Sequence, residues 1–247
     1  MRLLELGDPS GSPLVFLHGG NVAGWMWGLQ VPAFGHHRVL VPDLPGFGAS
    51  NDQAWDSIAG AADELAEQLP DGCHVVGLSL GSAVAIELAA RHPGRVADLM
   101  LASAQVAPPS RGVRALSRVM LAFWDRRGFW SALARSYGLR GDDAALFIET
   151  GLGIRRETAL AVFDEVSAGT PAASIAAIEA PTLAVAGERD RGAVASLSLL
   201  PSAVRAIAPG VGHQWNLESP QLFNAVLRHW LERRQAHPSL RAVTSPE

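Results

Sequence analysis

Short apolar runs recur along this chain, and stretches whose apolar residues have helical spacing separate them. Runs this short are typical of buried strands, whereas the longer amphipathic stretches predict helices that cross from one strand to the next. The pattern therefore predicts an α/β fold, a mostly parallel, doubly wound sheet. The expected strands lie at about residues 14–17, 39–41, 74–77, 99–102, 183–186 and 204–208.

Helices are expected between these strands, at about residues 55–68, 80–91, 193–200 and 220–233. Glycine-rich or polar segments directly follow several of the predicted strands. Because open α/β sheets collect ligands and catalytic groups at the carboxyl ends of their strands, these segments are the places to look for chemistry.

Residues 105–176 interrupt the alternation, since they hold several amphipathic helical stretches and no convincing strand. Residues 235–247 contain two prolines and mixed polar residues, which predicts a disordered tail. We therefore expect one domain, with a core formed by residues 1–104 and 177–234 and a helical insertion between the two parts.

Ser79 lies in the segment Gly77-Leu78-Ser79-Leu80-Gly81, between a predicted strand and a predicted helix. Small residues two positions before and after a serine allow the strand and the helix to approach closely at a sharp turn. The serine would then lie at a helix N-terminus, where free backbone N–H groups favour negative charge. This is a suitable place for a nucleophile.

Three further segments stand in a matching order along the chain. Leu17-His18-Gly19-Gly20, Gly187-Glu188-Arg189-Asp190 and Gly212-His213 each follow an apolar run, and Asp43-Leu44-Pro45-Gly46-Phe47-Gly48 adds a loop motif. With these motifs the chain resembles the α/β-hydrolase family over residues 13–231. In that family the catalytic residues follow one another as serine, then aspartate or glutamate, then histidine.

The resemblance implies a catalytic triad of Ser79, Asp190 and His213, and a cap formed by the helical insertion after the sixth strand of the family's sheet. It also implies an oxyanion hole made by the backbone N–H groups of Leu80 and Gly20. A serine hydroxyl needs such help, because at neutral pH it is a poor nucleophile until a histidine takes its proton.

Three other residues compete for these roles. Glu188 is a carboxylate two residues from Asp190, and His18 is a histidine beside the predicted oxyanion loop. Family position favours Asp190 as the acid, a loop-shaping role for His18, and a loop-organising role for Asp43.

Large aromatic side chains follow the oxyanion loop and recur in the insertion, and together they predict an apolar substrate pocket. The alternative for each of them is packing between cap and core. The predicted pocket residues are Trp25, Trp27, Phe123, Trp124, Trp130 and Trp215.

Composition narrows the chemistry further. The net charge of −4 gives no reason to expect a nucleic acid as partner, and all 20 basic residues are arginine, which excludes a lysine Schiff base or a phosphate-loop lysine. Cys73 is the single cysteine, so the chain has no internal disulfide, and no cluster of ligands predicts a metal site. No signal peptide or membrane span is evident, which predicts a cytoplasmic protein.

These observations predict a serine hydrolase that cleaves a carboxylic ester or thioester of a small, mainly apolar substrate without a cofactor. Carbon–carbon bond or lactone-type hydrolysis, cofactor-free perhydrolysis, and a ligand receptor without turnover remain open. Arg111, Arg114 and Arg118 have helical spacing, and this basic edge resembles the docking surface of esterases that act on an acyl carrier protein; a solvated helix face is the alternative.

Overall fold

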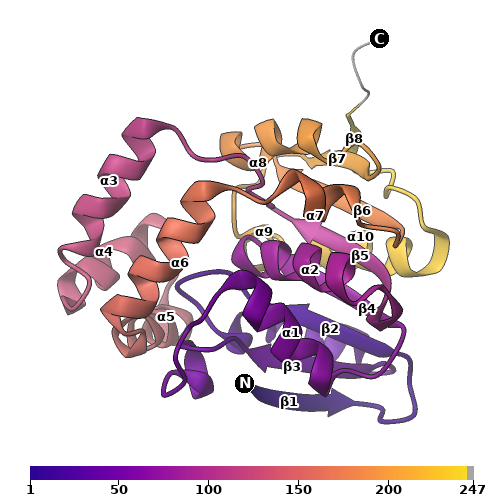
Figure 1. Cartoon of the computed structure of the whole chain (residues 1–247), viewed down its shortest axis with the longest axis horizontal. Coiled ribbons are helices and arrows are strands. Elements are labelled where there is room, and N and C mark those ends of the chain that lie inside the picture. The colour runs from indigo at the N-terminus through magenta and orange to yellow at the C-terminus, as the bar shows by residue number, and fades with distance from the viewer. Residues whose placement is uncertain (244–247) are drawn as a thin grey trace.

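An eight-stranded sheet runs through the part of the chain that the computed structural model describes, residues 1–243 (Figure 1). Its strand order is β1-β3-β2-β4-β5-β6-β7-β8, and the six inner strands are parallel, whereas β1 and β8 pair antiparallel at the two edges. The strands are β1 Arg2–Gly7, β2 Pro13–Leu17, β3 Arg38–Asp43, β4 Cys73–Leu78, β5 Val96–Ala102, β6 Thr182–Gly187, β7 Val204–Ala208 and β8 Arg241–Ala242.

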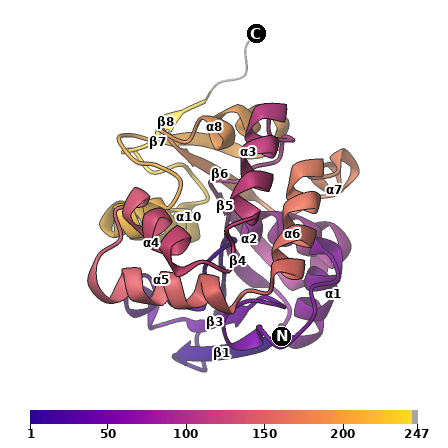
Figure 2. The ribbon, with the colours of Figure 1, turned by 90° about the vertical axis from the view of Figure 1, so that its left-hand side faces the viewer.

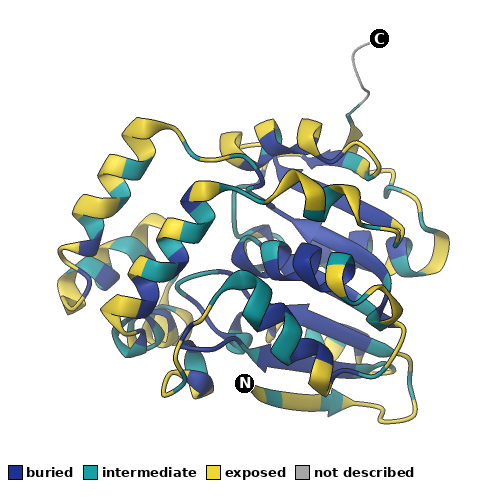
Figure 3. Ribbon diagram, viewed as in Figure 1, coloured by how far each residue is buried: buried dark blue, intermediate teal, exposed yellow. Residues whose placement is uncertain are grey.

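The inner strands are almost continuous apolar runs because both of their faces are covered. Every residue of β6 is buried, and Figure 3 shows the centre of the sheet in dark blue. The sequence analysis located the six inner strands but missed the two at the edges. β1 is mostly exposed, so no apolar run marks it, and β8 has only two residues.

Ten α-helices accompany the sheet within the described residues, and the helices predicted at residues 80–91 and 220–233 have those bounds. The helices are α1 Ile58–Gln68, α2 Leu80–Arg91, α3 Arg111–Leu121, α4 Arg127–Ser136, α5 Gly141–Gly153, α6 Arg156–Ala168, α7 Ala172–Ala176, α8 Arg191–Ser196, α9 Trp215–Glu218 and α10 Pro220–Arg233. Helix α1 begins later than predicted because the Ser57 side chain accepts the N–H of Gly60 and caps it.

The helices cover both faces of the sheet. Figure 2 shows α1 and α2 on one side of the strands and α10 on the other. A cluster of large aromatic side chains, Phe16, Trp27, Trp215 and Phe223, packs under α10, with ring centroids 4.5–5.6 Å apart from one ring to the next. This burial attaches α10 to the sheet and holds the loops near it.

The helical insertion leaves the sheet after β5, the strand beside β4, and Figure 1 shows α3 to α6 at one end of the molecule. Counted along this chain, it therefore follows the fifth strand, not the sixth, because only five strands come before it. Its last helix, α7, packs against α2 instead of joining the others.

The prediction of a disordered tail from residue 235 is wrong for residues 235–243. Arg241 and Ala242 pair with β7, the N–H of Val243 donates to the carbonyl oxygen of Arg205, and the Arg241 guanidinium lies 3.1 Å from Glu188. The segment is ordered because it satisfies the open edge of β7. The rest of the predicted tail, residues 244–247, lies outside the described residues.

Candidate active site

Ser79 stands on a sharp turn between β4 and α2. Its backbone has φ +56° and ψ −112°, a positive φ that residues with a side chain seldom adopt. A Cβ atom on Gly77 would lie 2.4 Å from the carbonyl oxygen of Gly81, and one on Gly81 would lie 2.2 Å from that of Leu17. Only glycine fits at these two positions, so the motif is explained by close packing around the serine.

Backbone N–H groups surround the serine. Leu80 is the first residue of α2, and the first N–H groups of a helix have no partner within it. The loop after β2 lies alongside, since a Cβ on Gly19 would be 3.6 Å from the Cβ of Ser79, while one on Gly20 would meet nothing within 4 Å. Gly20 thus opens toward the space in front of Ser79.

Two residues shape that loop without reaching the serine. The Leu44 N–H donates to Nε2 of His18 at 2.9 Å, so Nδ1 of this neutral ring is the atom that donates to the Gly19 carbonyl oxygen, at 2.8 Å. Full burial lowers the pKa of His18 and keeps it neutral. Asp43 accepts the N–H groups of Gly24 and Ala49, both at 2.7 Å. These contacts agree with the structural roles expected for both residues.

His213 and Asp190 meet across two neighbouring loops. Nδ1 of His213 lies 2.5 Å from Oδ2 of Asp190, while Oδ1 of Asp190 accepts the N–H of Ala193 and caps α8. Burial acts to raise the pKa of Asp190, but the hydrogen bond and charge of His213, with the N–H groups of Ala193 and Gly192, outweigh it and lower the pKa. Asp190 therefore stays ionised beside the histidine.

Several contacts hold these two loops together. A Cβ on Gly187 would lie 2.1 Å from the carbonyl oxygen of Gly212, and Glu218 accepts the N–H of Gly212 while pairing with Arg189. A contact that sequence reasoning missed is the hydroxyl of Ser103, which donates to the carbonyl oxygen of His213 at 2.8 Å. The positive φ that aims Ser103 has no signal in the sequence.

Glu188, the rival acid, points away from the histidine. Its carboxylate accepts the N–H of Gly210 and pairs with Arg241. Cys73 is buried, and burial raises the pKa of its thiol to about 12, so it offers no competing nucleophile. Among residues 1–243, no cluster of three or more histidine, cysteine or acidic side chains could hold a metal ion.

Ser79 and His213 line one cavity of about 390 Å³, and Gly20 and Leu80 line it too. The structure thus gathers four of the five predicted residues around one space, and Asp190 stands behind His213. The other walls are mainly apolar side chains from the insertion and from the loop after β3, among them Phe47, Met120, Phe129, Tyr137, Val162 and Phe163.

Of the six aromatic residues predicted for the pocket, Trp124 lines this cavity and the other five do not. Trp27 and Trp215 pack with Phe223 under α10, and Phe123 is exposed. The other two residues support the wall instead of forming it. Trp25 donates to the Thr150 hydroxyl, and Trp130 donates to the backbone of Trp124 and packs edge-on against its ring.

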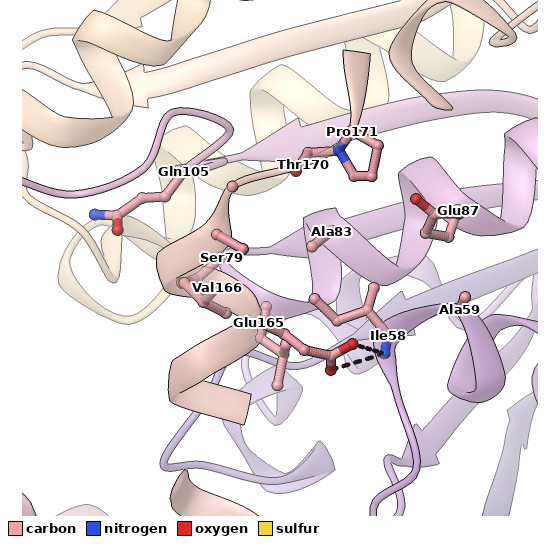
Figure 4. A pocket seen from close by; sticks show the side chains of 13 residues that line it. Ile58, Ala59, Ser79, Ala83, Glu87, Gln105, Glu165, Val166, Thr170 and Pro171 are labelled. Atoms are coloured by element: carbon pink, nitrogen blue, oxygen red, sulfur yellow. Dashed lines mark hydrogen bonds between the residues drawn. The ribbon is translucent and has the colours of Figure 1, made fainter. Parts of the chain in front are cut away.

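A second cavity, of about 230 Å³, opens on another side of Ser79 (Figure 4). It runs between α1, α2 and the segment that joins α6 to α7. Ser79 and Leu80 line both cavities, so the serine stands where the two spaces meet.

No helix within residues 1–243 combines the length and the apolar character that crossing a lipid bilayer requires.

Known proteins are similar to most of this chain. A model of the alpha/beta hydrolase family matches residues 14–226. The pimeloyl-[acyl-carrier protein] methyl ester esterase of Aeromonas hydrophila is 43% identical over 93 residues, which is 36% of this chain and 37% of that esterase. The aligned part is thus just over a third of that relative's length.

Two solved structures resemble the whole chain. One, described as Est816, an N-acyl homoserine lactone degrading enzyme, is 30% identical with a TM-score of 0.72, over 93% of this chain and 96% of that one. The other, a thermophilic esterase from Thermogutta terrifontis, is 23% identical with a TM-score of 0.76, over 95% and 94% of the two chains.

Proposed function

Because this chain belongs to the α/β-hydrolase family, we propose that it is a serine hydrolase that cleaves a carboxylic ester or thioester through an acyl-enzyme on Ser79. One observation carries the proposal. Ser79, on its strained turn, faces the same cavity as His213, and Nδ1 of that histidine lies 2.5 Å from Asp190. A nucleophile, a base and a group that orients the base are the parts that acyl transfer needs.

The first step is attack by Ser79. The Asp190 carboxylate accepts the Nδ1–H of His213 and so leaves Nε2 unprotonated toward the cavity. Nε2 removes the hydroxyl proton while Oγ bonds to the carbonyl carbon of the substrate. The charge that forms on His213 is stabilised by the ionised Asp190.

The negative charge that forms on the carbonyl oxygen is received by the N–H groups of Leu80 and Gly20. Both line the cavity at Ser79, and the dipole of α2 favours negative charge at the Leu80 end. In acyl-transfer enzymes the loss of one such donor raises the barrier by about 3–4 kcal/mol.

The second half regenerates the enzyme. The tetrahedral intermediate expels the alcohol or thiol, which takes the proton from His213, and leaves the acyl group on Ser79. A water molecule then gives a proton to His213 and attacks the acyl carbon, and the acid departs as Ser79 recovers its hydrogen. No redox reagent enters either step.

The insertion acts as a cap that sets the substrate class. The cavity beneath α3, α4 and α6 is lined by Met120, Leu121, Trp124, Phe129 and Phe163, which favours an apolar group on the reacting ester. These side chains also limit the access of bulk water to the site, which strengthens the charge interactions there while leaving room for the water that deacylates the enzyme.

A substrate carried on an acidic protein is a further part of the proposal. The relative from Aeromonas hydrophila is named for an ester carried on an acyl-carrier protein. In this chain, residues 105–140 hold seven arginines and a single acid, Asp125, although the net charge of the whole chain is −4. Arg111, Arg114 and Arg118 line one groove between α3 and α6. Changing all three to glutamine should slow the reaction on a carrier-bound ester at low salt and leave small esters unaffected.

Lactone hydrolysis is the second candidate, because the N-acyl homoserine lactone degrading enzyme is similar over nearly the whole of both chains. A lactone is a cyclic ester, so Ser79, His213 and Asp190 would perform the same steps. The alcohol released from the ring stays attached to the acyl group through its carbon chain, so hydrolysis of the acyl-enzyme yields a single hydroxy acid.

The deciding experiment compares the wild-type protein with Ser79→Ala on p-nitrophenyl esters, N-acyl homoserine lactones and vinylogous diketones. We expect wild-type turnover of at least one of the first two classes and a loss of roughly 10⁴-fold or more in the variant. A fluorophosphonate should label Ser79, as seen by mass spectrometry of the peptide. Undiminished turnover by Ser79→Ala would disprove the proposal, and no labelling with no turnover would favour a receptor.

A further inference from the structure

Glu87 is an acid whose side chain is mostly buried. It lies on α2, and only 8% of its surface is exposed. Within residues 1–243 its carboxyl group takes part in no hydrogen bond or ion pair, although its charge acts on Arg91 one helical turn further on. That arginine is bonded instead to Asp63 of α1, at 2.6 and 2.8 Å. The two carboxylate oxygens are accessible although most of the side chain is not, so the group is available to a ligand.

Glu87 lines the same second cavity as Ser79. Positions 79, 83 and 87 are four residues apart, which places them on one face of α2, and Figure 4 shows Ser79, Ala83 and Glu87 following one another along the helix. The rise of an α-helix puts positions 79 and 87 about 12 Å apart along its axis. The cavity therefore leads from the proposed nucleophile to Glu87.

The walls between the two ends are mostly apolar, with Ile58, Leu80, Ala83, Val166 and Pro171 among them. The cavity holds a second acid, Glu165, whose carboxylate is held in place by two N–H donors. It accepts the N–H of Ile58 and the indole N–H of Trp55, the latter at 2.9 Å. Glu87 differs in that its carboxylate makes no hydrogen bond or ion pair within residues 1–243.

We propose that this cavity is a specificity subsite for an apolar chain that ends in a cation, with Glu87 as the group that recognises the ammonium or guanidinium. The inference rests on the proposed function, because it takes Ser79 as the reacting end. The apolar walls would bury the chain, and the cation would form an ion pair with the Glu87 carboxylate. The other half of the substrate would occupy the larger cavity beneath the cap.

The first test measures kcat/KM for butyrate esters of ω-amino alcohols of increasing chain length, each beside the ester that has a methyl group in place of the ammonium. A second series carries the ammonium on the acyl half. We expect one chain length at which the cation raises kcat/KM by about tenfold, a preference that Glu87→Gln abolishes. Glu67→Gln, an exposed change of equal charge on α1, should retain it.

The second test removes turnover. In the Ser79→Ala protein, calorimetry should show tighter binding of the preferred cationic ester than of its neutral counterpart. The further change Glu87→Gln should remove the difference, and Ala83→Leu, which narrows the cavity between its two ends, should weaken both esters. Equal affinity for the two esters in the Ser79→Ala protein, or a preference that survives Glu87→Gln, would overturn the inference.

The two tests separate this inference from the proposed function. If the wild-type protein hydrolyses p-nitrophenyl butyrate but shows no cation preference at any length, the subsite is disproved and the hydrolase stands. If the cation preference appears in binding while Ser79→Ala leaves turnover unchanged, the subsite stands and Ser79 is not the nucleophile.

Discussion

Asp190 performs two tasks with its two oxygens. Oδ1 caps α8, and Oδ2 holds His213, so the helix fixes the carboxylate before the histidine meets it. Glu188 has equal charge only two residues away, yet it serves the loop at Gly210. The position of each acid in the turn, and not its charge, decides that Asp190 contacts His213 and Glu188 does not.

Asp190→Asn should therefore lower kcat by roughly 10³–10⁴-fold with little change in KM, because the amide cannot hold His213 in the required tautomer. Ester hydrolysis under saturating substrate measures it. The variant should still fold, since an amide oxygen can accept the N–H of Ala193. Glu188→Gln is the matched control, and a loss of equal size there would mean that the acid is assigned to the wrong residue.

Gly81 offers a second test, of packing instead of chemistry. Gly81→Ala places a Cβ 2.2 Å from the Leu17 carbonyl oxygen, so the backbone must shift and the free energy of unfolding should fall by about 2–3 kcal/mol. Gly94→Ala, where a Cβ meets nothing within 4 Å, should change it by less than about 0.5 kcal/mol. Urea unfolding of both variants checks this, and equal stabilities would contradict the close approach.

Helices α1 and α2 are joined at their surface by Asp63. This carboxylate accepts the Nε and Nη2 N–H groups of Arg91 and lies within hydrogen-bond distance of Nε2 of His92. These hydrogen bonds lower its pKa from 3.8 to about 2. A pKa below its ordinary value means that the folded protein holds the carboxylate in its charged form. The resulting stability is complete above the ordinary pKa and disappears as the pH falls toward 2.

Asp63→Asn should lower the free energy of unfolding near pH 6 by about 0.5–1 kcal/mol, a small value because the ion pair is solvent-exposed. The difference from the wild-type protein should shrink between pH 4 and 2, the window set by the two pKa values. Chemical denaturation across this range measures it. Glu67→Gln on the same helix should show no such convergence, and a constant difference for Asp63→Asn would argue against the ion pair.

The fold as a whole brings the segments of the candidate site together. Because β2, β4, β6 and β7 are parallel, the loops that follow them lie together at the carboxyl ends of the strands. The insertion covers these loops (Figure 1). At the far side of the sheet, β8 pairs with β7. The Asp190 segment lies between β6 and β7, and the His213 loop follows β7. The C-terminal segment thus supports the strand from which the His213 loop emerges.

Removal of residues 235–247 should lower the free energy of unfolding by about 1–2 kcal/mol relative to removal of residues 244–247 alone, because it breaks the β7 pairing and the Arg241–Glu188 contact. The bare edge of β7 should also promote self-association. Thermal or chemical unfolding together with light scattering would test both effects. Identical behaviour of the two truncations would show that β8 contributes nothing to stability.

Local pattern was sufficient for much of the fold. The inner strands, two helices with their bounds and the glycine motifs could be predicted because burial on both sides of a sheet and tight turns impose residue types directly. The edge strands could not be predicted from the sequence pattern, since exposed strands carry no apolar run. The pocket aromatics could not either: Trp27 and Trp124 are alike in sequence, but one packs under α10 and the other lines the cavity.

The sequence by itself determined the order of serine, acid and histidine, the turn at Ser79 and the identity of the loops that carry them, because each depends on a few neighbouring residues. Only the tertiary structure decided which aromatic side chains reach the cavity, that the Ser103 hydroxyl holds the His213 backbone, and that Glu87 lines a cavity two turns from Ser79. These facts depend on contacts between segments far apart in the chain, whose directions no local pattern encodes.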